Sequence, residues 1–213
     1  HRFIAGIDSQ SYAPYVRCPV LLLSAVNDKK HDYDRVYDTF QQINPEVQKA
    51  FLYSSHGNGL IGMHSLADVD LFLDKYLKER SVFLSGPIGL SVEEDAEGNL
   101  VARATFDAEG ELHECGIFYT ERITGSHARD WTRVMGNPAS VRESVGTFPL
   151  ELYEKSSRAL VYAFANYSNN FSVTSKIQEV VVRKPYKNMC VKSRIVYSSE
   201  RDSLNGVSGF RRR

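Results

Sequence analysis

Residues 19–26 read Pro-Val-Leu-Leu-Leu-Ser-Ala-Val, a continuous apolar run that is followed directly by Asn27 and Asp28. An unbroken apolar run of this length is typical of a parallel strand that is buried on both faces. Apolar residues then recur at helical spacing over residues 33–43, and a second strand-like run follows at residues 49–54. The order strand, helix, strand predicts parallel pairing through a right-handed crossover. Residues 1 to about 80 therefore read as α/β.

A second helix is expected after the glycine-rich stretch at residues 55–63. Ser65 and Asp68 have the spacing of a capping box at its start. Its expected apolar face comprises Leu66, Val69, Phe72, Leu73, Tyr76 and Leu77. Because two strands do not make a stable parallel sheet alone, we expect the remaining strands upstream of residue 1 or in a partner.

The pattern changes near residue 85, and short β-rich runs replace the helical periodicity up to about residue 183. The stretch Asp-Ala-Glu-Gly-Asn-Leu at residues 95–100 recurs as Asp-Ala-Glu-Gly-Glu-Leu at residues 107–112. Turn residues at this interval predict successive strands of an antiparallel, Ig-like β-sandwich, and they lack the ligand spacing of a calcium loop. We expect three parts, residues 1–82, 86–184 and 185–213, the last an irregular tail or the start of a further module.

Composition excludes several classes of function. The chain has 213 residues with 26 basic and 26 acidic side chains, so it has no excess of positive charge to attract the phosphate backbone of a nucleic acid. No apolar run is long enough to span a membrane, and no targeting pattern indicates a compartment. The three cysteines form no disulfide framework or metal pair, and we expect them to be small buried residues. No cofactor motif and no metal-ligand spacing are present.

Three residues are candidates for catalysis. Asp28 follows the first predicted strand and His56 follows the second, and the loops at the carboxyl ends of neighbouring parallel strands lie side by side. A carboxylate in that position can orient an imidazole and stabilise its charged form. His64, at the start of the closing helix, is the alternative base, and the position could also be held by Gly59, which leaves no catalytic histidine.

This order of elements resembles the C-terminal part of an α/β-hydrolase, in which the acid and then the histidine each follow a strand before a closing helix. The matching stretches are residues 18–28, 51–56 and 70–77. The closest likeness is to the branch of acetylxylan esterases and dienelactone-hydrolase-like proteins, some of which carry a β-sandwich after the hydrolase domain. The resemblance implies a parallel hydrolase sheet, a serine esterase activity and an ester of a small molecule or carbohydrate as substrate.

The nucleophile elbow Gly-x-Ser-x-Gly is not found in these 213 residues, and the chain begins at His1. We therefore expect a fragment that supplies the acid and the histidine, with the nucleophile in an upstream part of the same domain. The alternative is a non-catalytic carbohydrate- or protein-binding module on a degenerate hydrolase scaffold. Trp131, the single tryptophan, is expected to pack in a core or between domains rather than to hold a sugar.

Overall fold

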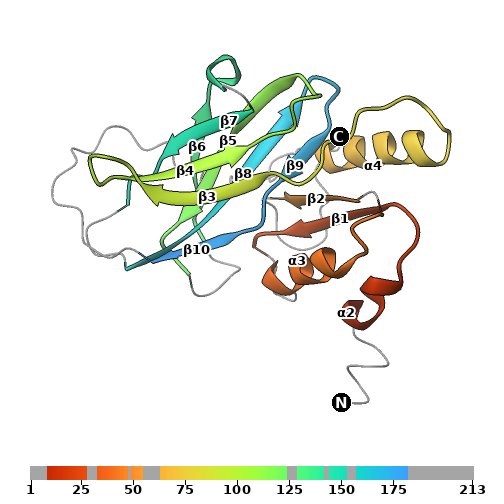
Figure 1. Ribbon diagram of the computed structural model, residues 1–213, viewed down its shortest axis with the longest axis horizontal. Helices are drawn as coiled ribbons and strands as arrows, with labels where there is room; N and C mark the ends of the chain where they lie inside the picture. The colour runs from red at the N-terminus through yellow and green to blue at the C-terminus, as the bar shows by residue number, and fades with distance from the viewer. Residues whose placement is uncertain are drawn as a thin grey trace, which may run out of the picture.

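The computed structural model describes residues 9–27, 33–47, 49–54, 63–123, 129–141, 144–152 and 157–181. Antiparallel strands in two sheets are the main secondary structure of this part of the chain, and a small group of helices and two parallel strands lies beside them (Figure 1). The predicted tail at residues 185–213 lies outside the described residues. The predicted division at residues 82 and 86 stays a prediction.

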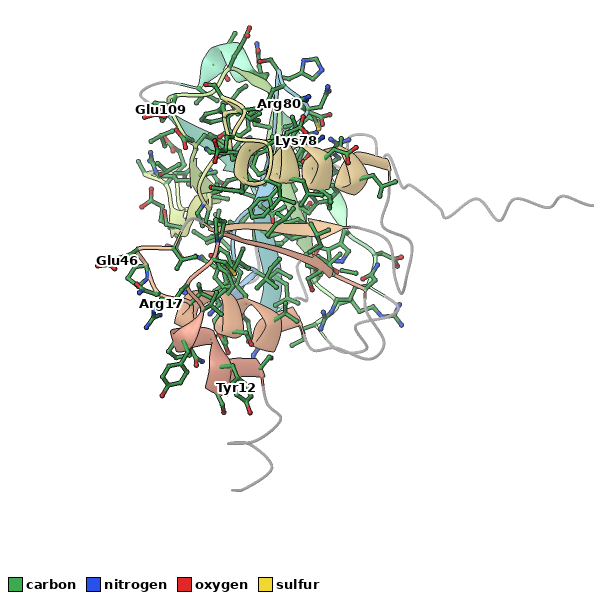
Figure 2. The ribbon with its side chains drawn as sticks, turned by 90° about the vertical axis from the view of Figure 1, so that its right-hand side faces the viewer. Tyr12, Arg17, Glu46, Lys78, Arg80 and Glu109 are labelled. Atoms are coloured by element: carbon green, nitrogen blue, oxygen red, sulfur yellow. The ribbon has the colours of Figure 1, made fainter. Side chains whose placement is uncertain are left out.

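The amino-terminal group begins with α2 (Ser9–Tyr12) and the short 3-10 helix η1 (Ala13–Tyr15). It continues with β1 (Val20–Ala25), α3 (Tyr33–Gln42), β2 (Lys49–Ser54) and α4 (Met63–Tyr76). Strands β1 and β2 pair in parallel, in a register that runs from Val20 opposite Lys49 to Ala25 opposite Ser54. In both views the strand pair lies between α3 and α4 (Figures 1 and 2).

Burial in this group differs from the sequence-based expectation. All six residues of β1 are only half-buried, and among the described residues β1 pairs with a strand along one edge alone. Leu66 and Leu73 on α4, and Leu77 directly after it, are exposed although they were expected to be buried. The predicted capping box is also wrong, since α4 begins at Met63 and Asp68 lies fully buried within the helix.

The antiparallel strands form two sheets, and their bounds are as follows. The three-stranded sheet has the order β3 (Gly89–Glu94), β4 (Leu100–Thr105) and β7 (Val145–Pro149). The five-stranded sheet has the order β10 (Gln178–Val181), β8 (Arg158–Tyr167), β5 (Leu112–Thr120) and β6 (Thr132–Gly136), with β9 (Ser172–Thr174) paired to β8. The 3-10 helix η3 (Pro138–Ser140) lies between β6 and β7.

The two sheets share one hydrophobic core. Alternate residues of each strand point inward, as the pleat of a β-strand requires. The three-stranded sheet contributes Ala102, Ala104 and Phe148, and the five-stranded sheet contributes Cys115, Ile117, Val161, Ala163 and Ala165. The rings of Phe106 and Phe148 meet edge to face within this core. The sandwich-like character expected for this part of the chain is therefore present.

The repeated Asp-Ala-Glu-Gly stretches are turns, as predicted. Asp95 Oδ1 accepts hydrogen bonds from the backbone N–H groups of Glu97 and Asn99, and Gly98 has a φ of 83°. In the second copy, Asp107 Oδ1 accepts from the N–H of Glu109. Because the carboxylates are used within their own turns, the turn interpretation is favoured over calcium binding.

A second hydrophobic cluster joins the amino-terminal group to the outer face of the five-stranded sheet. It contains Val26, Tyr37, Phe40 and Ile43 from the first part of the chain and Leu160, Tyr162 and Ile177 from the second. At its margin the Nζ of Lys176 lies 3.4 Å from Asp38 Oδ1. Within the described residues, the half-buried strand β1 thus packs against the sandwich rather than beside further parallel strands.

The α/β-hydrolase assignment is wrong. Among the described residues β1 and β2 form the one parallel pair of strands, every other strand pair is antiparallel, and one isolated parallel bridge joins Ile88 to Ser175. The hydrolase fold requires a wide parallel sheet with helices on both faces. The error arose because a strand–helix–strand pattern fixes only the local pairing. Within the described residues, no helix has the length and apolar character needed to cross a membrane.

Candidate functional site

The described residues do not test whether the three predicted catalytic residues lie together. Asp28 and His56 lie outside the described residues, and His64 is the second residue of α4, where its side chain is not described. The register does place the last residues of the two parallel strands, Ala25 and Ser54, opposite each other. The chain therefore leaves both strands at one edge, as expected, but the catalytic roles stay predictions.

The described residues offer a different site, on the outer face of the five-stranded sheet. Because Ile117 and Ala163 point into the core between the sheets, the residues one position away on the same strands point outward. These outward residues include Glu114, Phe118, Tyr162, Phe164 and Asn166, and Arg133 and Met135 from the edge strand β6.

Three polar side chains form what we call the Glu114 cluster, which consists of Glu114, Arg133 and Asn166. Arg133 Nη2 lies 2.7 Å from Glu114 Oε1, and each of the two side chains is 30% exposed. Asn166 Nδ2 donates to Glu114 Oε2 at 2.6 Å, from the position directly opposite on β8. Both carboxylate oxygens are thus engaged, and the cluster has a fixed geometry with no net charge.

A glycine makes this arrangement possible. Arg133 stands opposite Phe118 in the sheet, yet its guanidinium reaches Glu114, which is two outward positions away. The outward position between them is Gly116, directly opposite Phe164. A Cβ atom there would lie 2.3 Å from the backbone oxygen of Val134 and 2.8 Å from the Phe164 ring. The bare backbone therefore leaves room for both the aromatic ring and the arginine.

Aromatic rings support the cluster from below. The Arg133 guanidinium carbon lies 4.7 Å from the ring centroid of Phe164 and 5.6 Å from that of Phe118. Phe118 stacks on Tyr162, with centroids 5.2 Å apart and planes at 18°. Such cation–π contacts hold a guanidinium in place as well as stabilise it. Beside them, Met135 is 47% exposed and adds an apolar surface at the edge strand.

A further aromatic residue, Trp131, connects these rings to the amino-terminal group. Trp131 meets Tyr162 edge to face at 5.0 Å, and its Nε1–H donates to Asn27 Oδ1 at 3.2 Å. Asn27 Nδ2 in turn donates to the backbone oxygen of Arg129 at 3.4 Å, and the buried Arg129 donates from Nη2 to the oxygen of Ile123 at 2.8 Å. Trp131 is therefore a packing residue between the two parts of the chain, as predicted.

A cysteine is the sequence neighbour of Glu114. Cys115 is the nearest nucleophile in sequence, but its side chain is fully buried on the core side. Burial, and secondarily the charge of Glu114, raises the pKa of the Cys115 thiol, which disfavours the reactive thiolate. No group of three or more His, Cys, Asp or Glu that could hold a metal ion occurs within the described residues.

Sequence reasoning missed the Glu114 cluster and misjudged one cysteine. Cys115 is buried as expected, but Cys18 is exposed. A signal for the cluster was present in the alternation of Glu114, Gly116 and Phe118 along one strand-like run, and of Tyr162, Phe164 and Asn166 along another. Without the register, nothing indicated that the polar ends of the two runs would be cross-strand neighbours.

Comparison with known proteins adds no family. No protein-family model matches the sequence, and no curated protein matches it either. The resemblance to the acetylxylan esterase and dienelactone-hydrolase-like branch is therefore supported neither by a family match nor by the fold. The expectation of a serine esterase loses the basis on which it was made.

Proposed function

We propose that the chain is a non-catalytic binding module that holds a neutral carbohydrate on the outer face of the five-stranded sheet. The observation that carries this proposal is the position of the Arg133 guanidinium, which is held between the Glu114 carboxylate and the Phe164 ring on a half-exposed surface. Its donors are oriented before any ligand arrives, so little conformational entropy remains to be lost on binding.

The combination of groups suits a sugar. Small-molecule sites join an apolar lining to a few fixed polar groups that set the orientation of the ligand. Here the exposed Met135 and the half-buried Phe118 ring supply apolar surface, the guanidinium and the Asn166 amide supply donors, and the Glu114 carboxylate supplies acceptor lone pairs. Neighbouring hydroxyl groups of a pyranose both donate and accept, which matches this mixed set.

The charge of the cluster favours a neutral ligand over an anion. Arg133 is already paired with Glu114 at 2.7 Å, so a phosphate or carboxylate approaching the guanidinium would meet a fixed negative charge. The protein as a whole has no excess charge of either sign to attract an ion, with 26 basic and 26 acidic residues.

The proposal is tested by exposing the full chain to an array of neutral and acidic oligosaccharides and by titrating the retained glycan into the ¹⁵N-labelled protein. We expect a neutral glycan to be retained and to shift the side-chain amide resonances of Asn166. The matched reference is Asn99, whose side chain is bound within the β3–β4 turn and should not respond. Retention of no glycan, or shifts that spare Asn166, would contradict the proposal.

A further inference from the structure

Asp68 is a buried carboxyl group between α4 and β9. Its side chain is 0% exposed, and its Oδ1 accepts a 2.6 Å hydrogen bond from the backbone N–H of Ser172. Its Oδ2 is buried as well and has no hydrogen-bond partner among the described residues. The sequence suggested a capping role for this residue. In the structure its side chain instead forms a hydrogen bond that joins α4 to β9 of the sandwich.

An ionised carboxylate is costly in this position. Removing a charged group from water without pairing each of its oxygens carries a large desolvation penalty, whereas the protonated acid is neutral and carries its own donor. The hydrogen bond from Ser172 favours the charged form, but burial has the larger effect and raises the pKa of Asp68 to about 7.

The charged and titratable side chains that the structure describes on the surrounding elements do not compensate this charge. Neither β9 (Ser172–Thr174) nor β1 (Val20–Ala25) carries an ionisable side chain. On β8, burial raises the pKa values of both Tyr162 and Tyr167, which keeps the two phenols neutral. Glu114 on β5 is paired with Arg133.

The remaining groups lie on α4 and β2. Asp70 is exposed, and Asp74 is paired with Lys78 and Arg80. Lys75 lies over the ring of Tyr76. His64 precedes Asp68 by four residues on the helix, which is the spacing of neighbours on one helical face. The side chains of His64 and of Lys49 and Tyr53 in β2 are outside the described part of the chain.

We propose that the docking of α4 on β9 is a pH-sensitive contact, in which the protonated carboxyl group of Asp68 is accommodated at the interface and the ionised group loosens it. The pH effect is confined to the contact between α4 and β9, because the only described hydrogen bond of the carboxyl group is to Ser172. It does not depend on any ligand of the Glu114 cluster. Raising the pH through neutrality should therefore open the α4–β9 interface before the rest of the fold.

The experiment is a set of urea denaturations between pH 5 and pH 8 for the full chain and three variants. Asp68→Asn keeps the oxygen that accepts from Ser172 and removes the titration, Asp70→Asn is the exposed control on the same helix, and His64→Ala tests the neighbouring imidazole. We expect the unfolding equilibrium constant of the unmodified chain to rise at least tenfold between pH 5 and pH 7 relative to Asp68→Asn. The other two variants should behave like the unmodified chain.

An equal pH response in the Asp68→Asn variant would overturn the proposal, and so would a response that disappears only in His64→Ala. A second measurement covers the case in which Asp68→Asn does not fold. The carboxyl ¹³C resonance of Asp68 in the unmodified protein should titrate near neutrality, and hydrogen exchange at the Ser172 amide should accelerate over the same range. A titration midpoint below pH 5 would also overturn it.

Discussion

Trp131 Nε1–H donates to the side-chain oxygen of Asn27 at 3.2 Å, which joins two residues that are 104 positions apart in the chain. This bond lies beside the hydrophobic cluster in which Phe40 from α3 packs with Tyr162 from β8. The parallel strand pair and the antiparallel sheets therefore share buried surface. A two-stranded parallel sheet that is marginal alone is stabilised here by a sandwich rather than by further strands of its own kind.

A double-mutant cycle between Trp131→Phe and Asn27→Ala should give an interaction energy of about 1 kcal/mol. Phenylalanine keeps an aromatic ring against Tyr162 and removes the indole donor, so the cycle isolates the hydrogen bond. Urea denaturation measures the four stabilities. The control combines Trp131→Phe with Asn99→Ala in the distant β3–β4 turn, where the two effects should add. If the stability effects of Trp131→Phe and Asn27→Ala simply added, the hydrogen bond between the two side chains would contribute no stability.

Phe40→Ala should destabilise the whole described fold by about 3–5 kcal/mol, because the ring is 2% exposed in the shared cluster. Helical circular dichroism reports on α3 and α4, and the fluorescence of Trp131 reports on the junction with the sheet. The two transitions should coincide and move together in the variant. A helical transition that shifts while the fluorescence transition stays in place would show that the two parts unfold independently.

Gly116→Ala should cost about 3 kcal/mol or more, because the added methyl group would lie 2.3 Å from the backbone oxygen of Val134, which cannot move without breaking strand pairing. Gly86→Ala is the matched control, since its added Cβ meets no atom within 4 Å. Thermal denaturation of the two variants makes the comparison. Equal melting temperatures would mean that the close packing around Gly116 is not as described.

The sign of the pH effect at Asp68 follows from its raised pKa. A carboxyl group whose pKa is about 7 in the folded protein and 3.8 when unperturbed binds more protons in the folded than in the unfolded protein between these two pH values. The free energy of unfolding therefore falls as the pH rises from about 4 to 7, by up to about 4 kcal/mol, and is constant above that range. Comparing Asp68→Asn with the unmodified chain at pH 5 and pH 8 measures this difference.

Asp74 and Asp95 contribute with the opposite sign at lower pH. The hydrogen bonds from Lys78 to Asp74 and from the Asn99 backbone to Asp95 lower the pKa values of these two carboxyl groups. Their stabilising effect is present above the unfolded pKa and is lost as the pH falls through the lowered values. The maximum of stability should accordingly lie on the acidic side of neutrality, and it should move toward higher pH in Asp68→Asn.

Local structure was predictable from the sequence where interactions between residues close together in the chain determine it. The helical spacing of Val36, Tyr37 and Phe40 gave α3, and the apolar run at residues 20–25 gave a strand that pairs in parallel with residues 49–54. The Asp95 and Asp107 turns followed from side-chain geometry that acts within a few residues. Strands β4 and β8 likewise fall within the stretch up to about residue 183 in which short β-rich runs were expected.

The errors concern what each element packs against. Leu73 has the periodicity of a buried face, but α4 turns Asp68 toward the sandwich and leaves Leu73 exposed. The residues around Asp68 in the sequence do not show whether it caps a helix or is buried against a partner. Its partner, Ser172, lies 104 positions further along the chain. The Glu114 cluster depends in the same way on the register of three strands, which alternation alone does not determine.

The most direct test of the binding account is calorimetric titration of the retained neutral glycan into the unmodified chain, Arg133→Gln and Arg103→Gln. Arg103 is the matched control, because it also forms a cross-strand ion pair, with Glu93, on the other sheet. Loss of a charged hydrogen-bond donor should weaken binding by about tenfold or more in Arg133→Gln. Arg103→Gln should bind like the unmodified chain. Equal affinity in all three proteins would contradict the assignment of the Glu114 cluster as the binding site.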